Sequence, residues 1–178
     1  LTYIHAFDDP RVAAGQGTVA IEMLEAVPDL DRMIIPIGGG GLFSGMATAA
    51  KAIRPEIKLT GVQAALYPSM YAKLNGKTMA AGGDTLAEGI AVQNPSEFTA
   101  AIIKDHADEI LLVSEAELEG AVSLLLQIEK TVVEGAGAAG LAALLSNKEK
   151  FAGEKVGLVL CGGNIDTRLL ANVLLRDL

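Results

Sequence analysis

The sequence predicts an α/β domain: an open, mostly parallel twisted sheet with helices on both faces. Short apolar runs alternate with helical segments along the chain, and glycine turns separate several of them. These apolar runs are continuous, which is typical of parallel strands that are covered on both faces. Hydrophobic residues make up 51% of the 178 residues. No apolar run reaches the roughly 20 residues of a membrane span, so we assign this surplus to a buried core.

The first half of the chain shows the alternation clearly. Residues 2–6 form a short candidate strand, and residues 17–26 have the composition of a helix. The run RMIIPI, residues 32–37, is a strand that leads directly into four glycines. Residues 42–53 are small, apolar and free of internal proline, which predicts a helix that ends before Pro55.

The next elements are strands at residues 58–63 and 109–113. The second strand leads into a helix over residues 116–130. Ser114 precedes this helix and Glu117 follows three residues later, which is the pattern of a capping box.

The last third of the chain predicts a helix rich in alanine and glycine over residues 135–145. A strand over residues 156–160 and a closing helix follow it. Residues 75–97 are the least regular stretch. We therefore expect a single α/β domain over residues 1–178. The chain begins with Leu rather than Met and ends within a helical pattern, so we expect a fragment of a longer catalytic chain.

Charge and cysteine content exclude some functions. The net charge is −8 and no basic stripe is present, which argues against binding to nucleic acid. Cys161 is the only cysteine, so an internal disulfide is excluded and a reducing cytoplasm is expected. We expect no membrane partner, because no targeting segment is recognisable.

Four consecutive glycines, residues 38–41, lie between an apolar strand and a helix. Each glycine loses more conformational freedom on folding than any other residue, and a simple turn needs only one or two. Backbone amides without neighbouring Cβ atoms, at the start of a helix, are suited to bind an anion. We interpret the run as a phosphate-binding loop, and a purely structural turn is the alternative.

The spacing does not fit the common nucleotide loops. A dinucleotide fingerprint needs a third glycine where this chain has Phe43 or Ser44, depending on the glycine from which the motif is counted. It also needs an acidic residue at the end of the next strand, where Gln63 stands. A P-loop needs a lysine after the glycines, and none follows.

The motifs IPIGGGGLFSG, LAEGIAV, VVEGAGAAGLAALL and LVLCGGNID occur in this order, after the opening HAFDDPRVAAGQGTVAIE. In this combination the chain resembles fold-type II pyridoxal phosphate enzymes. More narrowly, it resembles threonine dehydratase (threonine ammonia-lyase), with serine racemase as a close relative. The resemblance spans essentially the whole chain and implies that it is mainly the large domain of such an enzyme.

The resemblance implies a role for particular residues. In the family, the amides that hold the cofactor phosphate correspond to Gly38, Gly39, Gly40, Gly41 and Leu42. Cys161 matches the Ser or Cys that hydrogen-bonds the pyridine nitrogen. Gly89 matches a backbone position beside the ring, and Glu134 matches an acidic residue near the cofactor edge. Without the resemblance, a cysteine at a strand end such as Cys161 is usually a small core residue, and Glu134 is equally compatible with a cap of the helix that follows it.

The family's catalytic lysine, which forms a Schiff base with the cofactor, lies upstream of the matching segment. The small domain and the loop that grips the substrate carboxylate are absent as well. We therefore assign no catalytic residue in this chain and expect the fragment alone to be inactive. We assign no metal site either, because Gln63 stands where the serine racemase branch has a metal-binding Glu. This amide favours a dehydratase over a racemase.

For the parent protein, the resemblance implies a pyridoxal phosphate-dependent ammonia-lyase of amino-acid metabolism. It would convert L-threonine, and also L-serine, to 2-oxobutanoate or pyruvate and ammonia, as a homodimer or homotetramer. Two alternatives stay open. One is a serine racemase or another β-eliminating relative, and the other is a non-catalytic module for phosphate-ligand binding or assembly.

Overall fold

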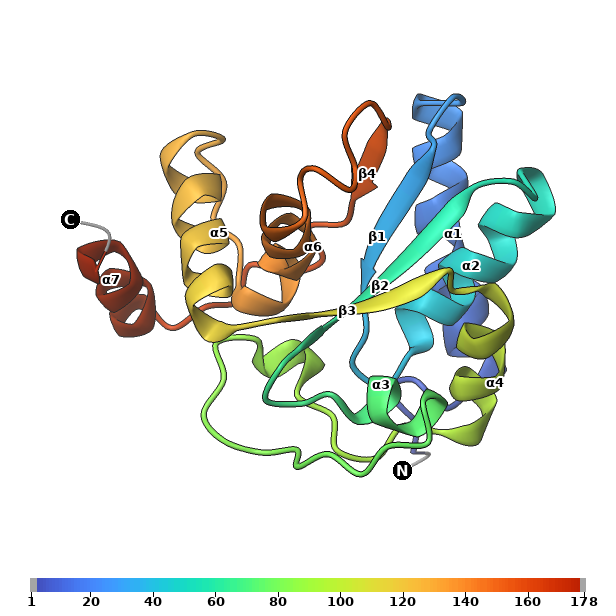
Figure 1. Ribbon diagram of the computed structural model, residues 1–178, viewed down its shortest axis with the longest axis horizontal. Helices are drawn as coiled ribbons and strands as arrows, with labels where there is room; N and C mark the ends of the chain where they lie inside the picture. Colours follow the sequence, from blue (N-terminus) through green and yellow to red (C-terminus); the bar gives the residue numbers. More distant parts are fainter. Residues whose placement is uncertain (1–2, 177–178) are drawn as a thin grey trace.

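A four-stranded parallel sheet in the order β3-β2-β1-β4 forms the centre of the molecule (Figure 1). The structure, a computed structural model, describes residues 3–176. The strands are β1 (Arg32–Pro36), β2 (Lys58–Ala64), β3 (Glu109–Val113) and β4 (Val156–Leu158). The helices are α1 (Pro10–Ala26), α2 (Gly41–Ile53), α3 (Ser69–Leu74), α4 (Glu97–His106), α5 (Glu115–Gln127), α6 (Gly135–Ser146) and α7 (Thr167–Arg176), with a short 3₁₀ helix, η1, at Glu88–Ile90.

The helices form a layer on each face of the sheet. Figure 1 shows α1, α2 and α4 on one side and α5, α6 and α7 on the other. Alternate side chains of β1 point into the two cores: Ile34 packs into the core on the α5 and α6 side, while Met33 and Ile35 pack towards α1 and α2. All three side chains are fully buried. Both faces of β1 are therefore covered, which explains the continuous apolar run at residues 33–35.

Glycine allows α1 and α2 to approach each other closely. A Cβ atom on Gly45 of α2 would lie 1.9 Å from the carbonyl oxygen of Ala13 in α1. The start of α1 is fixed by Asp9, whose Oδ1 accepts a hydrogen bond from the Arg11 amide at 2.8 Å, and by Pro10 at the first helical position. The close packing holds α1 against the helix that follows the glycine run.

Most predicted elements are confirmed, including the capping box of Ser114 and Glu117. The predicted helix at 17–26 is longer than expected, because it begins at Pro10. The predicted strand at residues 2–6 is wrong for residues 3–6, which form no strand, and Thr2 lies outside the described residues. Among the described residues, no strand pairs with residues 3–6, so their side chains have no sheet to join. Two helices, α3 and α4, were not expected.

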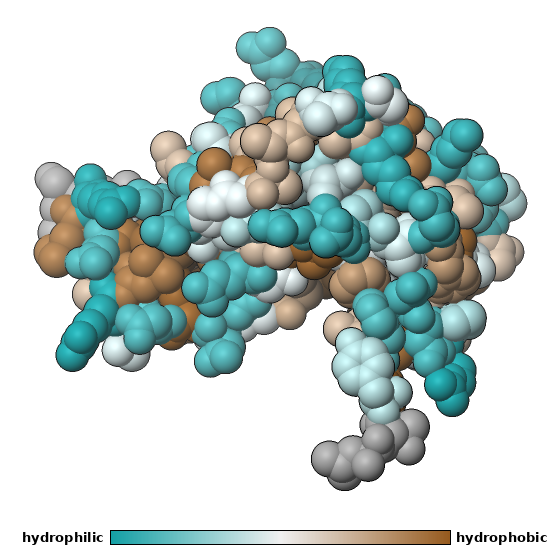
Figure 2. Space-filling model, turned by 90° about the horizontal axis from the view of Figure 1, so that it is seen from below, coloured by the Kyte–Doolittle hydropathy of each residue, from teal (hydrophilic) through white to brown (hydrophobic). Residues whose placement is uncertain are grey.

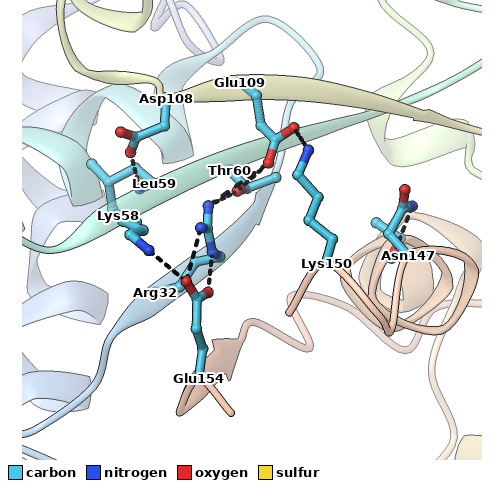
Figure 3. A network of polar contacts seen from close by, with 10 residues as sticks. Arg32, Lys58, Leu59, Thr60, Asp108, Glu109, Asn147, Lys150 and Glu154 are labelled. Atoms are coloured by element: carbon cyan, nitrogen blue, oxygen red, sulfur yellow. Dashed lines mark hydrogen bonds and ion pairs between the residues drawn. The ribbon is translucent and has the colours of Figure 1, made fainter. Parts of the chain in front are cut away.

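An ion network ties the amino ends of the strands together (Figure 3). Arg32 at the start of β1 pairs with Glu154, which also accepts from Lys58 at the start of β2. Glu109 at the start of β3 lies 3.7 Å from Arg32 and also pairs with Lys150. The network lies at the opposite end of the sheet from the glycine run, so it stabilises the sheet without entering the candidate site.

Figure 2 shows hydrophilic and apolar residues mixed on the side in view, with a clear apolar area near the end that carries α7. Exposed apolar side chains of α5, α7 and the residue after α5 belong to this end of the molecule: Leu124, Ile128, Leu169 and Leu175. Within the described part of the chain, no helix has both the length and the hydropathy needed to cross a membrane.

Candidate cofactor site

The carboxyl ends of the parallel strands form the edge at which α/β proteins bind ligands. The glycine loop (residues 38–42) follows β1, and the segment with Cys161 follows the neighbouring strand β4. A cavity of about 630 Å³ opens here, within the usual size range of small-molecule sites. Its lining includes every residue that the sequence analysis singled out for the cofactor: Gly38, Gly39, Gly40, Gly41, Leu42, Gly89, Glu134 and Cys161.

The amides of the glycine loop have no hydrogen-bond partner within the described part of the chain. Among residues 3–176, none of the backbone N–H groups of residues 38–42 donates a hydrogen bond to another part of the protein. Gly40 has a φ of 93°, a left-handed conformation that favours glycine, and α2 begins at the next residue. The loop therefore presents unpaired donors at the positive end of a helix, which is the arrangement of an anion site.

Thr99 of α4 fixes the loop from behind. Its hydroxyl donates a 2.7 Å hydrogen bond to the carbonyl oxygen of Gly39, and a Cβ atom on Gly40 would lie 2.8 Å from the Thr99 Cβ. Thr99 is fully buried and is itself held by Ser96, whose Oγ accepts from the Thr99 amide at 3.1 Å. The carbonyl is thus satisfied by protein while the amides are not. Sequence reasoning missed Thr99 because it missed α4, although Ser96 followed by Glu97 is a recognisable helix start.

Phe7 covers part of the glycine loop. A Cβ atom on Gly39 would lie 2.2 Å from the Phe7 ring, and one on Gly41 would lie 3.0 Å from the Phe7 Cβ. The side chain of His5 supports this position: its Nδ1 accepts from the Phe7 amide at 3.3 Å, and its ring meets the Phe7 ring edge-on. Sequence reasoning missed Phe7 as a site residue, because nothing in the local pattern shows what a ring in an irregular segment will contact.

Cys161 lies in the segment after β4 and lines the cavity. Its thiol is 4.0 Å from the carbonyl oxygen of Ala136, within reach of a weak S–H···O hydrogen bond. Although the residue is exposed to the cavity, the desolvation that the surrounding protein causes raises the pKa of the thiol, and the Glu134 carboxylate raises it further. The thiol is therefore kept neutral and can act as a hydrogen-bond donor.

Glu134 occupies the N-cap position of α6, but its side chain makes no capping hydrogen bond. Its Oε2 instead accepts from the Asn164 amide at 3.1 Å. A Cβ atom on Gly89 would lie 2.9 Å from Glu134 Oε1, so these two residues are neighbours at the cavity wall. The side chain of Glu134 is therefore bound to the loop after β4, and it does not cap α6.

Gln63 has a structural position. It is fully buried in β2, its amide nitrogen donates to the Ile37 carbonyl at 3.2 Å, and its Oε1 accepts from the Tyr71 amide at 2.8 Å. Both polar ends of the side chain are therefore satisfied by backbone. Gln63 connects the residue before the glycine loop to α3 and does not face the cavity.

The family that matches residues 1–162 is described as "Pyridoxal-phosphate dependent enzyme". The chain belongs to this family. The matched residues include the four strands, the glycine loop and all the predicted cofactor residues. The family is therefore recognised by the same segments that line the cavity.

Within this family, the chain is similar to threonine ammonia-lyases and serine racemases. The L-threonine ammonia-lyase of Thermotoga maritima is 44% identical over 178 residues, which cover 99% of this chain and 44% of that protein. The processed form of threonine deaminase isoform 2 from Solanum lycopersicum has a TM-score of 0.89 at 33% identity, covering 97% of this chain and 52% of that one. Maize serine racemase has a TM-score of 0.86 at 35% identity, covering 98% and 56%. The chain spans about half the length of these proteins.

The residues present fit pyridoxal phosphate, the cofactor of the family. The unpaired amides of the glycine loop match its phosphate, and the neutral thiol of Cys161 matches an acceptor such as the ring nitrogen. The volume of about 630 Å³ accommodates a ligand of this size. No lysine is among the residues that line the cavity in the described part of the chain.

Proposed function

We propose that this chain is the cofactor-binding half of a threonine ammonia-lyase. The observation that carries the proposal is the convergence of the glycine loop, Gly89, Glu134 and Cys161 on one cavity at the carboxyl edge of the sheet. The similarity to L-threonine ammonia-lyase over 99% of the chain supports the choice within the family. The site residues named above are part of this proposal.

The glycine loop would anchor the cofactor phosphate. Amides of residues 38–42 donate to the phosphate oxygens, and the start of α2 adds its positive end. Thr99 keeps the Gly39 carbonyl directed into the protein, so that the carbonyl does not compete for the site. Gly89 lines the same cavity and would be the backbone beside the ring.

Cys161 would donate its S–H to the ring nitrogen. When bound, the cofactor supplies an electron-withdrawing ring that stabilises negative charge at the α-carbon of the substrate. A neutral thiol donor leaves the nitrogen largely unprotonated, which limits that withdrawal. Such a setting suits elimination, in which the β-hydroxyl departs soon after the α-proton. The substrate loses water, and hydrolysis then releases ammonia and the 2-oxoacid, so no oxidant is needed.

Maize serine racemase has almost the same fold, so a racemase is the second candidate within the family. Gln63 favours the lyase, because both ends of its amide are bonded to backbone and neither is available to a cation. Product analysis with L-threonine, L-serine and D-serine on the full-length protein separates the two. 2-Oxobutanoate from threonine supports the lyase, whereas rapid conversion of L-serine to D-serine supports the racemase.

We also propose a cytoplasmic homodimer or homotetramer. Exposed Leu124, Ile128 and Leu175 at the α5 and α7 end of the molecule support self-association. The single thiol supports a reducing compartment. Light scattering of the full-length protein measures the assembly, and a monomer at micromolar concentration would contradict it.

Cofactor binding by the chain itself tests the central proposal. Equilibrium dialysis should show saturable binding of pyridoxal phosphate and at least tenfold weaker binding of pyridoxal, because a phosphate contact contributes about 1.4 kcal/mol or more. Borohydride should leave no stoichiometric adduct on one lysine, and threonine should not be deaminated faster than by free cofactor. Equal binding of pyridoxal would refute the phosphate role, and no binding of either would favour an assembly module.

A further inference from the structure

Two loops and one helix start meet at the side chain of Glu134. The first loop connects α3 to α4 and contains Gly89 in η1. The second follows β4 and runs from Cys161 to Asn164, and α6 begins at Gly135. Glu134 is half-buried and lines the main cavity as well as a neighbouring one of about 400 Å³. Its contacts account for the composition of both loops.

Glu134 binds the second loop at two points. Its backbone N–H donates to the Gly162 carbonyl at 3.0 Å, and its Oε2 accepts from the Asn164 amide at 3.1 Å. The two bonded residues lie on either side of Gly163, so the loop is fixed both before and after this residue. Because Cys161 directly precedes the first bonded residue, the position of its thiol depends on this clamp.

The carboxylate also explains two glycines. A Cβ atom on Gly162 would lie 2.7 Å from Glu134 Oε1, and the three nearest heavy atoms to it all belong to Glu134. A Cβ atom on Gly89 would lie 2.9 Å from the same oxygen. The side chain is therefore fitted between two backbones that come from different parts of the sequence. Neither glycine has a positive φ, so crowding by Glu134 and its neighbours, not backbone conformation, is what the missing Cβ relieves.

We propose that Glu134 is a positioning residue, which clamps the Cys161–Asn164 loop against the Gly89 segment and thereby fixes where the thiol meets the cavity. The role differs from direct contact with the cofactor edge. It rests on the proposed function only in treating Cys161 as the group that faces the ligand. The three tests below are made without cofactor, so their failure would leave phosphate binding by the glycine loop untouched.

Alkylation of the thiol by iodoacetamide reports on the clamp, because the chain has one cysteine. A rate profile against pH separates two effects of Glu134. Removing the carboxylate in Glu134→Gln or Glu134→Ala should lower the pH midpoint, since the charge contributes to the raised pKa of Cys161. The limiting rate at high pH should rise about fivefold or more in Glu134→Ala alone, because only alanine loses the acceptor for the Asn164 amide.

Hydrogen exchange at the Asn164 amide should follow the same order, faster in Glu134→Ala and close to wild type in Glu134→Gln. Glu88→Ala is the matched control, since it removes an exposed carboxylate that lines the same neighbouring cavity. It should change neither the limiting rate nor the exchange. An unchanged limiting rate in Glu134→Ala, or a glutamine variant as fast as alanine, would overturn the proposal.

A double-mutant cycle adds a steric test. Gly162→Ala should accelerate alkylation in the wild-type background, because the new methyl group meets the Glu134 carboxylate. In the Glu134→Ala background the same change should have little further effect, since the atoms that crowd it are gone. Additive effects would show that the two residues act independently and would contradict the clamp.

Discussion

Arg32 and Glu154, 122 residues apart, form a two-point ion pair at the amino edge of the sheet. Arg32 Nε lies 2.6 Å from Oε2, and Nη2 lies 3.2 Å from Oε1. Arg32 is only 6% exposed, and its Nη1 also donates to the Thr60 hydroxyl at 2.8 Å. The pair joins β1 to the turn before β4 (Figure 3). These two neighbouring strands are the most widely separated in sequence, so the pair stabilises the sheet where its strands come from distant parts of the chain.

Removing this carboxylate should destabilise the fold. Glu154→Ala leaves a buried guanidinium with fewer partners, and we expect the free energy of unfolding to fall by about 2–3 kcal/mol. Urea denaturation measures the change. Glu56→Ala is the control, because Glu56 forms an exposed pair with Arg54 and its loss should change the stability much less. Equal losses in the two variants would show that burial of Arg32 does not matter.

The same pair predicts the response to acid. Arg32, and next Lys58, lower the pKa of Glu154 to about 2 in the folded protein, from an ordinary value of 4.5. A carboxyl group with a lowered folded pKa contributes stability above its unfolded pKa and loses it as the pH falls towards the folded value. We expect this contribution to be lost between about pH 4.5 and 2. Urea titrations over this window should show a shallower decline in Glu154→Gln than in wild type, and parallel curves would contradict the assignment.

Gly40→Ala should impair the glycine loop more than its backbone strain explains. Gly40 and Gly153 both have positive φ, 93° and 83°, but only a Cβ on Gly40 would meet neighbours, at 2.8 Å from Thr99 and Ile103. Gly153→Ala should cost about 1 kcal/mol of stability from strain alone and leave pyridoxal phosphate binding unchanged. Gly40→Ala should cost about 3 kcal/mol and weaken that binding at least tenfold in the folded fraction. Similar binding by both variants would count against an anion site here.

Phe7→Ala should expose the glycine loop. The ring packs on Gly39 and Gly41, and we expect it to move aside when an anion binds to the amides. Removing it should tighten binding of inorganic phosphate roughly tenfold, because about 1–2 kcal/mol of apolar contact no longer has to be broken. Calorimetric titration measures this. Tyr3→Ala is the control, since that side chain is 81% exposed and belongs to the same segment. Unchanged or weaker binding in Phe7→Ala would mean that the ring does not compete with the anion.

Much of the fold could be predicted from the sequence because local patterns carry it. The apolar run of β1 marks a strand that is covered on both faces, and the start of α5 follows from the capping box. The short segment 2–6 misled, because a few apolar residues fit a strand equally well whether or not a partner strand exists. The helix α4, which begins at Glu97 where the irregular stretch of residues 75–97 ends, was not predicted.

The sequence by itself determined the α/β class and the glycine run, because both follow from local patterns. Gly89, Glu134 and Cys161 became candidates only through the family resemblance of the motifs that contain them. Tertiary structure alone decided that Thr99 supports the loop, that Phe7 lies on it, and that Glu134 fits between Gly89 and Gly162. These contacts join residues about 30 to 60 positions apart, and their distances depend on how strands and helices pack. A motif specifies which groups are available, whereas packing specifies which of them meet.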